Sequence, residues 1–270
     1  MSAPDHRFLA EKLTATAWRA GAVIMSYFGN VEVELKDDAS PVTAADRESE
    51  AVIVAELAAL APDITIISEE SATTPEILPG SQFFLVDPLD GTKEFISGRG
   101  EFTVNIALIE NATPVFGLVY APARSKIFIT LSSERAVSAD LDALASEPVF
   151  DNITWHELGT RTPPPEGLVA AVSRSHLDEQ TENFLSQHAI SDTISGGSSV
   201  KFCLIAEGKA DVYPRFGRTM EWDTAAGHAV LAAAGGDVLD ETGKPLRYGK
   251  TDRGLDNPGF VAWGRCPRSG

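Results

Sequence analysis

The chain has 270 residues, of which 43% are hydrophobic and 23% charged, and this balance excludes a disordered chain and a coiled coil. Lysine and arginine number 22 against 39 aspartates and glutamates, giving a formal charge of −17. That charge argues against binding a nucleic acid polymer or anionic lipid. Small phosphorylated substrates stay compatible with it, because carboxylates hold divalent cations and the cations hold phosphate.

Targeting and membrane signals are also missing from the sequence. No apolar run approaches the ~20 residues that a membrane-spanning helix needs, so we expect no integral membrane contact. The first residues lack the basic region and hydrophobic stretch of a secretory signal. Two cysteines, Cys203 and Cys266, are too few for a disulfide framework. We therefore predict a cytoplasmic protein; peripheral contact with an inner membrane and assembly as a homodimer are left open.

Helices come first in the predicted order of elements. Apolar residues from Leu9 to Phe28 recur every three or four positions, which predicts an amphipathic helix ended by Gly29. A second helix is predicted over about 44–60, with Pro62 stopping it. The texture then changes to short segments rich in β-branched or aromatic residues. These predict consecutive strands at 64–67, 83–86, 103–109, 115–120 and 126–131.

The second half alternates strand and helix patterns. Weak periodicity over 138–165, closing with three prolines, marks a boundary between lobes of about 1–150 and 151–270 within one domain. Beyond it the sequence predicts strands at 168–172 and near Val238 and Val261, and helices at 178–187, 198–207 and 223–234. Helices, a run of strands and then alternation indicate the α/β class, as an α+β layered sandwich of alternating helix and sheet layers.

The most informative segment, Asp-Pro-Leu-Asp-Gly-Thr at 87–92, follows a buried strand. Pro88 fixes its own φ and has no N–H, so the chain leaves the strand in a stiff turn. Such a turn aims Asp87, Asp90 and the carbonyl oxygen of Leu89 at one point. Hard oxygen ligands on a rigid turn suit Mg²⁺.

The same segment also reads as an ordinary Asp-Pro and Asp-Gly turn that closes a strand. Carboxylates elsewhere favour the metal-binding interpretation. Glu69 follows the strand at 64–67, and Asp223 opens a predicted helix, where it also suits an N-cap. Gly91 lets the backbone approach a ligand closely, and Thr92 adds a hydroxyl.

These motifs together resemble the inositol monophosphatase superfamily of magnesium-dependent, lithium-sensitive phosphatases. Its hallmarks are Glu-Glu after a strand, Asp-Pro-x-Asp-Gly-Thr, and Trp-Asp-x-Ala-Ala-Gly, which occur here in order at 69–70, 87–92 and 222–227. Pro-Val-Thr-Ala-Ala-Asp at 41–46 resembles the family's further aspartate segment. The resemblance spans about 9–263 and implies an inositol monophosphatase-like fold.

Within the superfamily the sequence is similar to the CysQ-type 3'(2'),5'-bisphosphate nucleotidases. The segments that carry this similarity are 93–96, 173–176, 196–202 and 206–215. One departure is Ser68, which stands where many relatives have glycine and removes no ligand. The resemblance implies hydrolysis of adenosine 3',5'-bisphosphate to AMP, and of phosphoadenosine phosphosulfate to adenosine phosphosulfate, in sulfur assimilation. The alternatives are an inositol monophosphatase, another small sugar or polyol phosphatase, and a catalytically dead binding module.

The resemblance also implies roles for individual residues. Mg²⁺ is the implied cofactor, with two or three ions per site. Glu69, Asp87 and the Leu89 carbonyl would hold one ion, and Asp87, Asp90 and Asp223 a second. Thr92, with Asp46 accepting its proton, and Glu69 would be catalytic. The implied residues of the substrate site are Glu69, Leu89, Asp90, Gly91, Thr92, His176, Ser198, Lys201 and Asp223.

Lys201 is the candidate partner for the second phosphate of a bisphosphate nucleotide. The metal ions would neutralise only the phosphate that is cleaved, so the other phosphate needs its own cation. Lys201 falls in the first turns of a predicted helix, where the Ser198 and Ser199 amides would help. The alternative interpretation is a solvated lysine on an exposed helix face.

Overall fold

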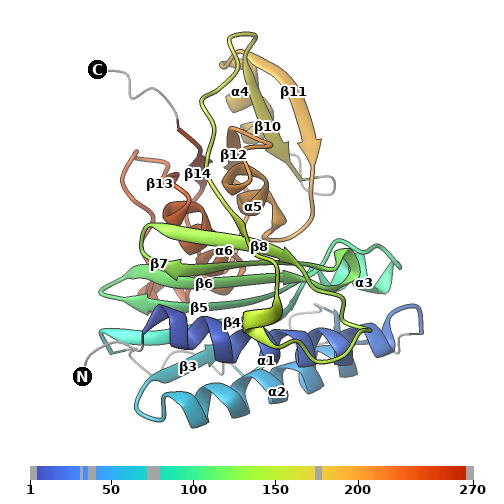
Figure 1. The fold of residues 1–270 in the computed structure, drawn as a ribbon. Coiled ribbons are helices and arrows are strands. Elements are labelled where there is room, and N and C mark those ends of the chain that lie inside the picture. The colour runs from blue at the N-terminus through green and yellow to red at the C-terminus, as the bar shows by residue number, and fades with distance from the viewer. Residues whose placement is uncertain (1–4, 31–32, 36–40, 72–79, 174–177, 266–270) are drawn as a thin grey trace.

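Five alternating layers of helix and sheet make up the fold (Figure 1). The structure is a computed structural model that describes residues 5–30, 33–35, 41–71, 80–173 and 178–265. Helices α1 (His6–Tyr27) and α2 (Ala44–Leu60) cover one face of a seven-stranded sheet. Helices α5 (Val200–Ala206) and α6 (Glu221–Ala233) lie between that sheet and a five-stranded one. Helix α4 (Glu179–Ser186) packs on the far face of the smaller sheet.

The seven-stranded sheet has the order β3-β4-β5-β6-β7-β8-β9. Strands β3 and β4 pair in parallel, and every later pair is antiparallel. Its strands are β3 (Thr65–Ser68), β4 (Gln82–Asp90), β5 (Thr103–Glu110), β6 (Thr113–Ala121), β7 (Lys126–Ser132), β8 (Arg135–Asp140) and β9 (His156–Glu157).

The five-stranded sheet has the order β11-β10-β12-β14-β13. Strand β10 is parallel to both of its neighbours, whereas β14 is antiparallel to both of its own. Its strands are β10 (Leu168–Val172), β11 (Ile190–Ser195), β12 (Val212–Arg215), β13 (Asp237–Asp240) and β14 (Phe260–Trp263). The remaining short elements are β1 (Val33–Leu35), β2 (Pro41–Thr43), α3 (Thr92–Ile96), η1 (Pro122–Arg124), η2 (Phe150–Asn152) and η3 (Thr251–Arg253).

Burial on both faces explains the nearly continuous apolar run of β4. Phe84 and Val86 face α1 and α2, while Phe83 and Leu85 face the layer that holds α6. Because helices cover both faces, the strand has no reason to alternate apolar with polar residues. Asp87 is the first polar side chain that is buried along this strand, and it is therefore a candidate functional residue.

The fold class predicted from the sequence is confirmed. Helices α1 and α2 and strands β3 to β7 lie where the sequence predicts them, within a few residues. Strands β8, β11 and β12 were not predicted, because β11 is mostly exposed and the other two lack a long apolar run. The large sheet ends at Glu157, slightly beyond the expected lobe boundary at 150, and the division into lobes stays a prediction. None of the described helices is long and apolar enough to cross a bilayer.

His228 is a buried imidazole in the middle of α6. Its Nδ1 lies 3.0 Å from the hydroxyl oxygen of Tyr248. Burial lowers the pKa of His228 to about 3, and the charge of Arg247 adds to this effect. The folded protein therefore keeps His228 neutral at pH values where an exposed histidine takes up a proton.

We expect His228 to make the protein less stable as the pH falls. The unfolded chain, with a histidine pKa of about 6.5, takes up a proton as the pH falls, whereas the folded chain does not. The free energy of unfolding therefore falls by about 1.4 kcal/mol between about pH 7.5 and pH 5.5. His228→Gln should remove this component from urea unfolding curves measured at both pH values. The control is His156→Gln, because His156 is exposed. An equal pH dependence in wild type and His228→Gln would contradict the prediction.

Candidate active site

The end of β4 is bent by a bulge that re-aims its last residues. Asp87 pairs with Asn105 of β5 and Asp90 pairs with Thr103, so β4 advances one residue more than its partner. Pro88 has no N–H to give to the ladder, which explains the break at this position. The Leu89 N–H donates to Asp87 Oδ1 at 3.0 Å and fixes that carboxylate.

Gly91 and Thr92 carry the chain from the bulge into α3. Gly91 has φ +97°, and a Cβ there would lie 2.6 Å from Ser198 Oγ, so the position needs glycine. The Thr92 hydroxyl lies 3.2 Å from Asp46 Oδ1 and 3.2 Å from the Leu89 carbonyl oxygen. Asp46 is itself fixed, because its Oδ2 accepts the N–H and the hydroxyl of Thr43.

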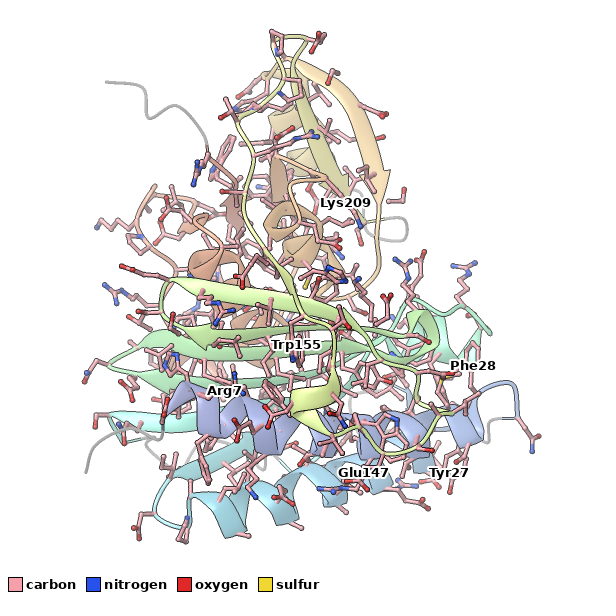
Figure 2. All side chains as sticks on the ribbon, viewed as in Figure 1. Arg7, Tyr27, Phe28, Glu147, Trp155 and Lys209 are labelled. Carbon is pink, nitrogen blue, oxygen red and sulfur yellow. The ribbon has the colours of Figure 1, made fainter. Side chains whose placement is uncertain are left out.

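Helix α3 is held in place by a small aromatic cluster. Phe95 of α3 contacts Phe102 edge-on with ring centroids 5.1 Å apart. Phe28, which follows the last residue of α1, packs on both rings, and Figure 2 labels it beside this end of the molecule. This packing fixes the direction in which the chain leaves Thr92.

Two further carboxylates come from other elements. Glu69 follows β3, and its N–H donates to the Val86 carbonyl, so it continues the pairing with β4. Asp223 lies in the first turn of α6, and its Oδ2 accepts the Met220 N–H at 2.8 Å. Asp223 is therefore not the N-cap residue that the sequence predicts. It lies three residues after the N-cap, at the third position of the helix.

A cavity of about 260 Å³ collects most of the residues predicted for the site. Of those residues, the ones that line it are Glu69, Asp87, Leu89, Asp90, Gly91, Thr92, Ser198, Lys201 and Asp223. Asp46 lies behind the lining and reaches it through Thr92. His176 lies outside the described residues.

The acidic wall of this cavity is made of carboxylates that repel one another. Burial, followed by the charges of neighbouring carboxylates, raises the pKa of Asp87 well above its usual range. The same two causes raise the pKa of Asp223 well above its usual range. Burial raises the pKa of Asp90 to about 6, although the nearby Lys201 opposes this rise. Like charges that are buried together favour protonation or a bound cation.

The chemistry of this wall fits Mg²⁺. Carboxylate oxygens and the Leu89 carbonyl are the hard donors that Mg²⁺ prefers, and a cation would relieve the repulsion that raises these pKa values. In the described parts of the chain, no three His, Cys, Asp or Glu side chains already surround one point as a complete ligand set. Asp87 and Asp223 instead accept backbone N–H groups. The assignment of ligands to ions stays a prediction.

Two serines join the two halves of the site. Ser198 Oγ donates to the Asp90 carbonyl at 2.8 Å and also lies 3.1 Å from the Glu101 carbonyl. Ser199 Oγ donates to the Asp223 carbonyl at 2.7 Å. These bonds connect the end of β4 to the start of α6, so the predicted position of Ser198 at the site has a structural basis.

Lys201 is buried and not on an exposed helix face, so the alternative interpretation of a solvated lysine is wrong. Its Nζ donates to the carbonyls of Ser198 at 2.8 Å and Gly196 at 3.2 Å. An ammonium group has three N–H donors, of which two bind these carbonyls, and Lys201 also lines the cavity. Burial lowers the pKa of Lys201 to about 8, whereas the charge of Asp90 raises it.

Arg215 is a second cation at the cavity, and the sequence analysis missed it. It ends β12, and its Nη2 donates to the Arg218 carbonyl at 3.2 Å. Its Nε is buried and has no hydrogen-bond partner among the described residues, as expected of a group that binds a ligand. The available signal was its place after a short apolar stretch at 212–214, which predicts a strand end.

The layered α/β fold and the acidic cavity at the end of a strand are typical of one class of phosphatase. The comparisons with known proteins indicate the same class. The sequence profile of the "Inositol monophosphatase family" matches residues 5–262. The chain therefore belongs to the inositol monophosphatase family.

Individual relatives are more specific. A Shigella flexneri protein named 3'(2'),5'-bisphosphate nucleotidase CysQ is 44% identical over 256 residues, covering 93% of this chain and 98% of that protein. A protein of the same name from Escherichia coli K12 is 43% identical over the same shares. The crystal structure of CysQ from Bacteroides thetaiotaomicron superposes with a TM-score of 0.80 at 38% identity, covering 96% of this chain and 98% of that one.

Replacing Asp90 should separate activity from stability. Asp90→Asn removes a charged oxygen ligand for the metal ion, and we expect turnover with Mg²⁺ to fall by at least about 100-fold. Even replacement of a residue that only orients a metal ligand lowers metal affinity or activity by about 10–100-fold. The metal-free variant should have a higher Tm than wild type above about pH 6, since less repulsion is left. Both quantities are measured on one preparation, with Asp63→Asn at an exposed turn as the control. Near wild-type turnover in Asp90→Asn would refute its role.

Proposed function

We propose that the chain is a Mg²⁺-dependent 3'(2'),5'-bisphosphate nucleotidase. It removes the 3'-phosphate of adenosine 3',5'-bisphosphate to give AMP, and it converts phosphoadenosine phosphosulfate to adenosine phosphosulfate. Support comes from membership of the inositol monophosphatase family and from relatives at 43–44% identity that carry the nucleotidase name. Two or three Mg²⁺ ions per site are part of the proposal.

The single observation that carries this function is a cavity with an acidic and a basic wall. The acidic wall, with Asp87, Asp90 and Asp223, suits the metal ions and the phosphate that is cleaved. The basic wall, with Lys201 and Arg215, suits a second anionic group. A substrate with one phosphate has no second anionic group to contact the basic wall, whereas a bisphosphate nucleotide has one anionic group for each wall.

Thr92 and Asp46 orient the water that attacks phosphorus. The carboxylate of Asp46 accepts the Thr92 hydroxyl proton, so the oxygen lone pairs of Thr92 are directed to accept a proton from water. Thr43 prevents Asp46 from turning away, because it donates twice to the other carboxylate oxygen. When bound, Mg²⁺ lowers the pKa of water and neutralises phosphate oxygens.

The carboxylates and the loop amides complete the site. Glu69, Asp87 and the Leu89 carbonyl hold one cation, and Asp87, Asp90 and Asp223 hold another. Gly91 lines the cavity and lets the backbone approach the phosphate closely, since the position carries no side chain. His176 is retained as a proposed substrate contact.

The proposal also includes a location and an assembly. A cytoplasmic location is supported by the low number of cysteines, of which Cys203 is free and buried. Nothing in the described residues bears on a homodimer, which stays a prediction.

A substrate comparison tests the proposed function. Phosphate release is measured from adenosine 3',5'-bisphosphate and from inositol 1-phosphate, each with Mg²⁺ and with a chelator. We expect kcat/KM to be at least about 10-fold higher for the nucleotide, because a second anion contacts the basic wall through charged hydrogen bonds. Activity should vanish with the chelator. A preference for inositol 1-phosphate would instead support an inositol monophosphatase or another small polyol phosphatase.

Arg215 and Lys201 should differ in their effects on substrate choice. Arg215→Met should lower kcat/KM for adenosine 3',5'-bisphosphate relative to 3'-AMP by about 10–100-fold, since a charged hydrogen bond is worth 1.5–3 kcal/mol. Lys201→Met should lower activity on both substrates, because it also leaves two buried carbonyls without a donor. Arg218→Met serves as the control, since Arg218 is 74% exposed. An unchanged substrate ratio in Arg215→Met would exclude its role.

A further inference from the structure

Glu221 is a completely buried carboxylate whose surroundings the proposed function does not use. It is the first residue of α6 and is 0% exposed. Its Oε2 accepts the Gly249 N–H at 2.6 Å, and its Oε1 accepts the Lys250 N–H at 2.9 Å. The Lys250 ammonium lies 2.6 Å from the same Oε1. Burying a carboxylate is costly, so a fully partnered one at this position needs a reason.

The segment 247–257, which we term the strap, surrounds the first turn of α6. The Leu255 carbonyl accepts the Glu221 N–H at 2.9 Å. Asn257 Nδ2 donates to the Met220 carbonyl at 2.8 Å and lies 3.1 Å from Thr224 Oγ1. The Tyr248 hydroxyl lies 3.3 Å from the same Thr224 oxygen. The strap thus contacts Met220 and Glu221, which precede Asp223, and Thr224, which follows it.

The beginning of α6 does not require this arrangement for its own sake. Asp223 already caps the helix by accepting the Met220 N–H. A glutamate in the first turn of a helix is normally favourable while exposed, through its interaction with the helix dipole. The burial of Glu221 therefore serves something other than the start of the helix.

Repulsion at the cavity supplies that reason. The charges of Asp90 and Glu69 act on Asp223, which sits in the same helical turn as Glu221. Repulsion of this kind favours a larger separation between the first turn of α6 and β4. Bonds from the strap to Glu221 oppose such a movement, and Glu221 itself does not line the cavity.

We propose that Glu221 is a positioning residue that, together with the strap at 247–257, holds Asp223 in place for metal binding. The proposal rests on the proposed function, because it requires that Asp223 binds Mg²⁺. It assigns a role to a part of the C-terminal sequence in which no motif is recognisable.

The test compares Glu221→Gln with a matched buried carboxylate. Gln keeps the shape of Glu221 but loses its charge and one acceptor, so one buried N–H of the strap is left unpartnered. The control is Asp211→Asn, because Asp211 is also buried and binds one basic side chain, Arg161, and one backbone N–H, that of Val169. Asp211 lies away from the cavity lining, so its replacement tests the loss of stability alone.

Mg²⁺ affinity is measured by titration calorimetry on the full chain, together with the rise in Tm on adding Mg²⁺ and with kcat/KM. Both variants should have a lower metal-free Tm. Glu221→Gln should lose at least about 10-fold in Mg²⁺ affinity, as residues that orient a metal ligand do, and Asp211→Asn should keep it. Equal affinity in Glu221→Gln and wild type, or an equal loss in Asp211→Asn, would overturn the proposal.

Lys250→Met provides the second variant. It removes the ion pair but keeps both backbone N–H bonds, so it should fold and lose Mg²⁺ affinity by about 3-fold, as for the loss of a single net hydrogen bond and less than for Glu221→Gln. If Glu221→Gln does not fold, unchanged affinity in Lys250→Met overturns the proposal. Wild-type protein that fails to bind Mg²⁺ would contradict the proposed function itself, which separates the two failures.

Discussion

Mutual repulsion among the carboxylates around one cavity is the constraint on which the rest of this structure depends. Burial and neighbouring charge raise the pKa values of Asp87, Asp90 and Asp223. Two like charges 4 Å apart repel by about 4 kcal/mol at an effective dielectric constant of 20. Any element that could move would relieve this repulsion by moving apart. The segments that carry these residues must therefore be held by interactions that outweigh this repulsion.

Those interactions are made mostly by the backbone. The bulge in β4 is fixed by its register with β5, and Ser198 and Ser199 bind the carbonyls of Asp90 and Asp223. A Cβ at Gly197 would lie 2.5 Å from the Glu101 carbonyl, so the loop packs against the other half of the site without a side chain between them. Each bond contributes only about 1 kcal/mol, but several act on the same few residues.

The local part of the site could be predicted from the sequence, and the long-range part could not. Residues 87–92 are contiguous, and their turn chemistry follows from Pro88 and Gly91 alone. The burial of Lys201 depends instead on its packing against Tyr213, whose ring centroid lies 5.0 Å from Nζ. Glu221 likewise gives no local sign that its partners lie at 249–250. The same reason explains β8, β11 and β12, whose pairing is set by neighbours and not by their own apolar pattern.

The overall negative charge does not prevent the cavity from binding an anion. Charges in water are screened over about 8 Å at physiological ionic strength, so distant surface carboxylates act weakly on the site. Lys201 is buried and Asp90 is half-buried, and each favours the charged form of the other: Lys201 lowers the pKa of Asp90, and Asp90 raises that of Lys201. The acidic and basic walls therefore depend on each other. A change that neutralises one of them shifts the protonation of the other, so under the proposed function metal binding and anion binding would be coupled through this pair.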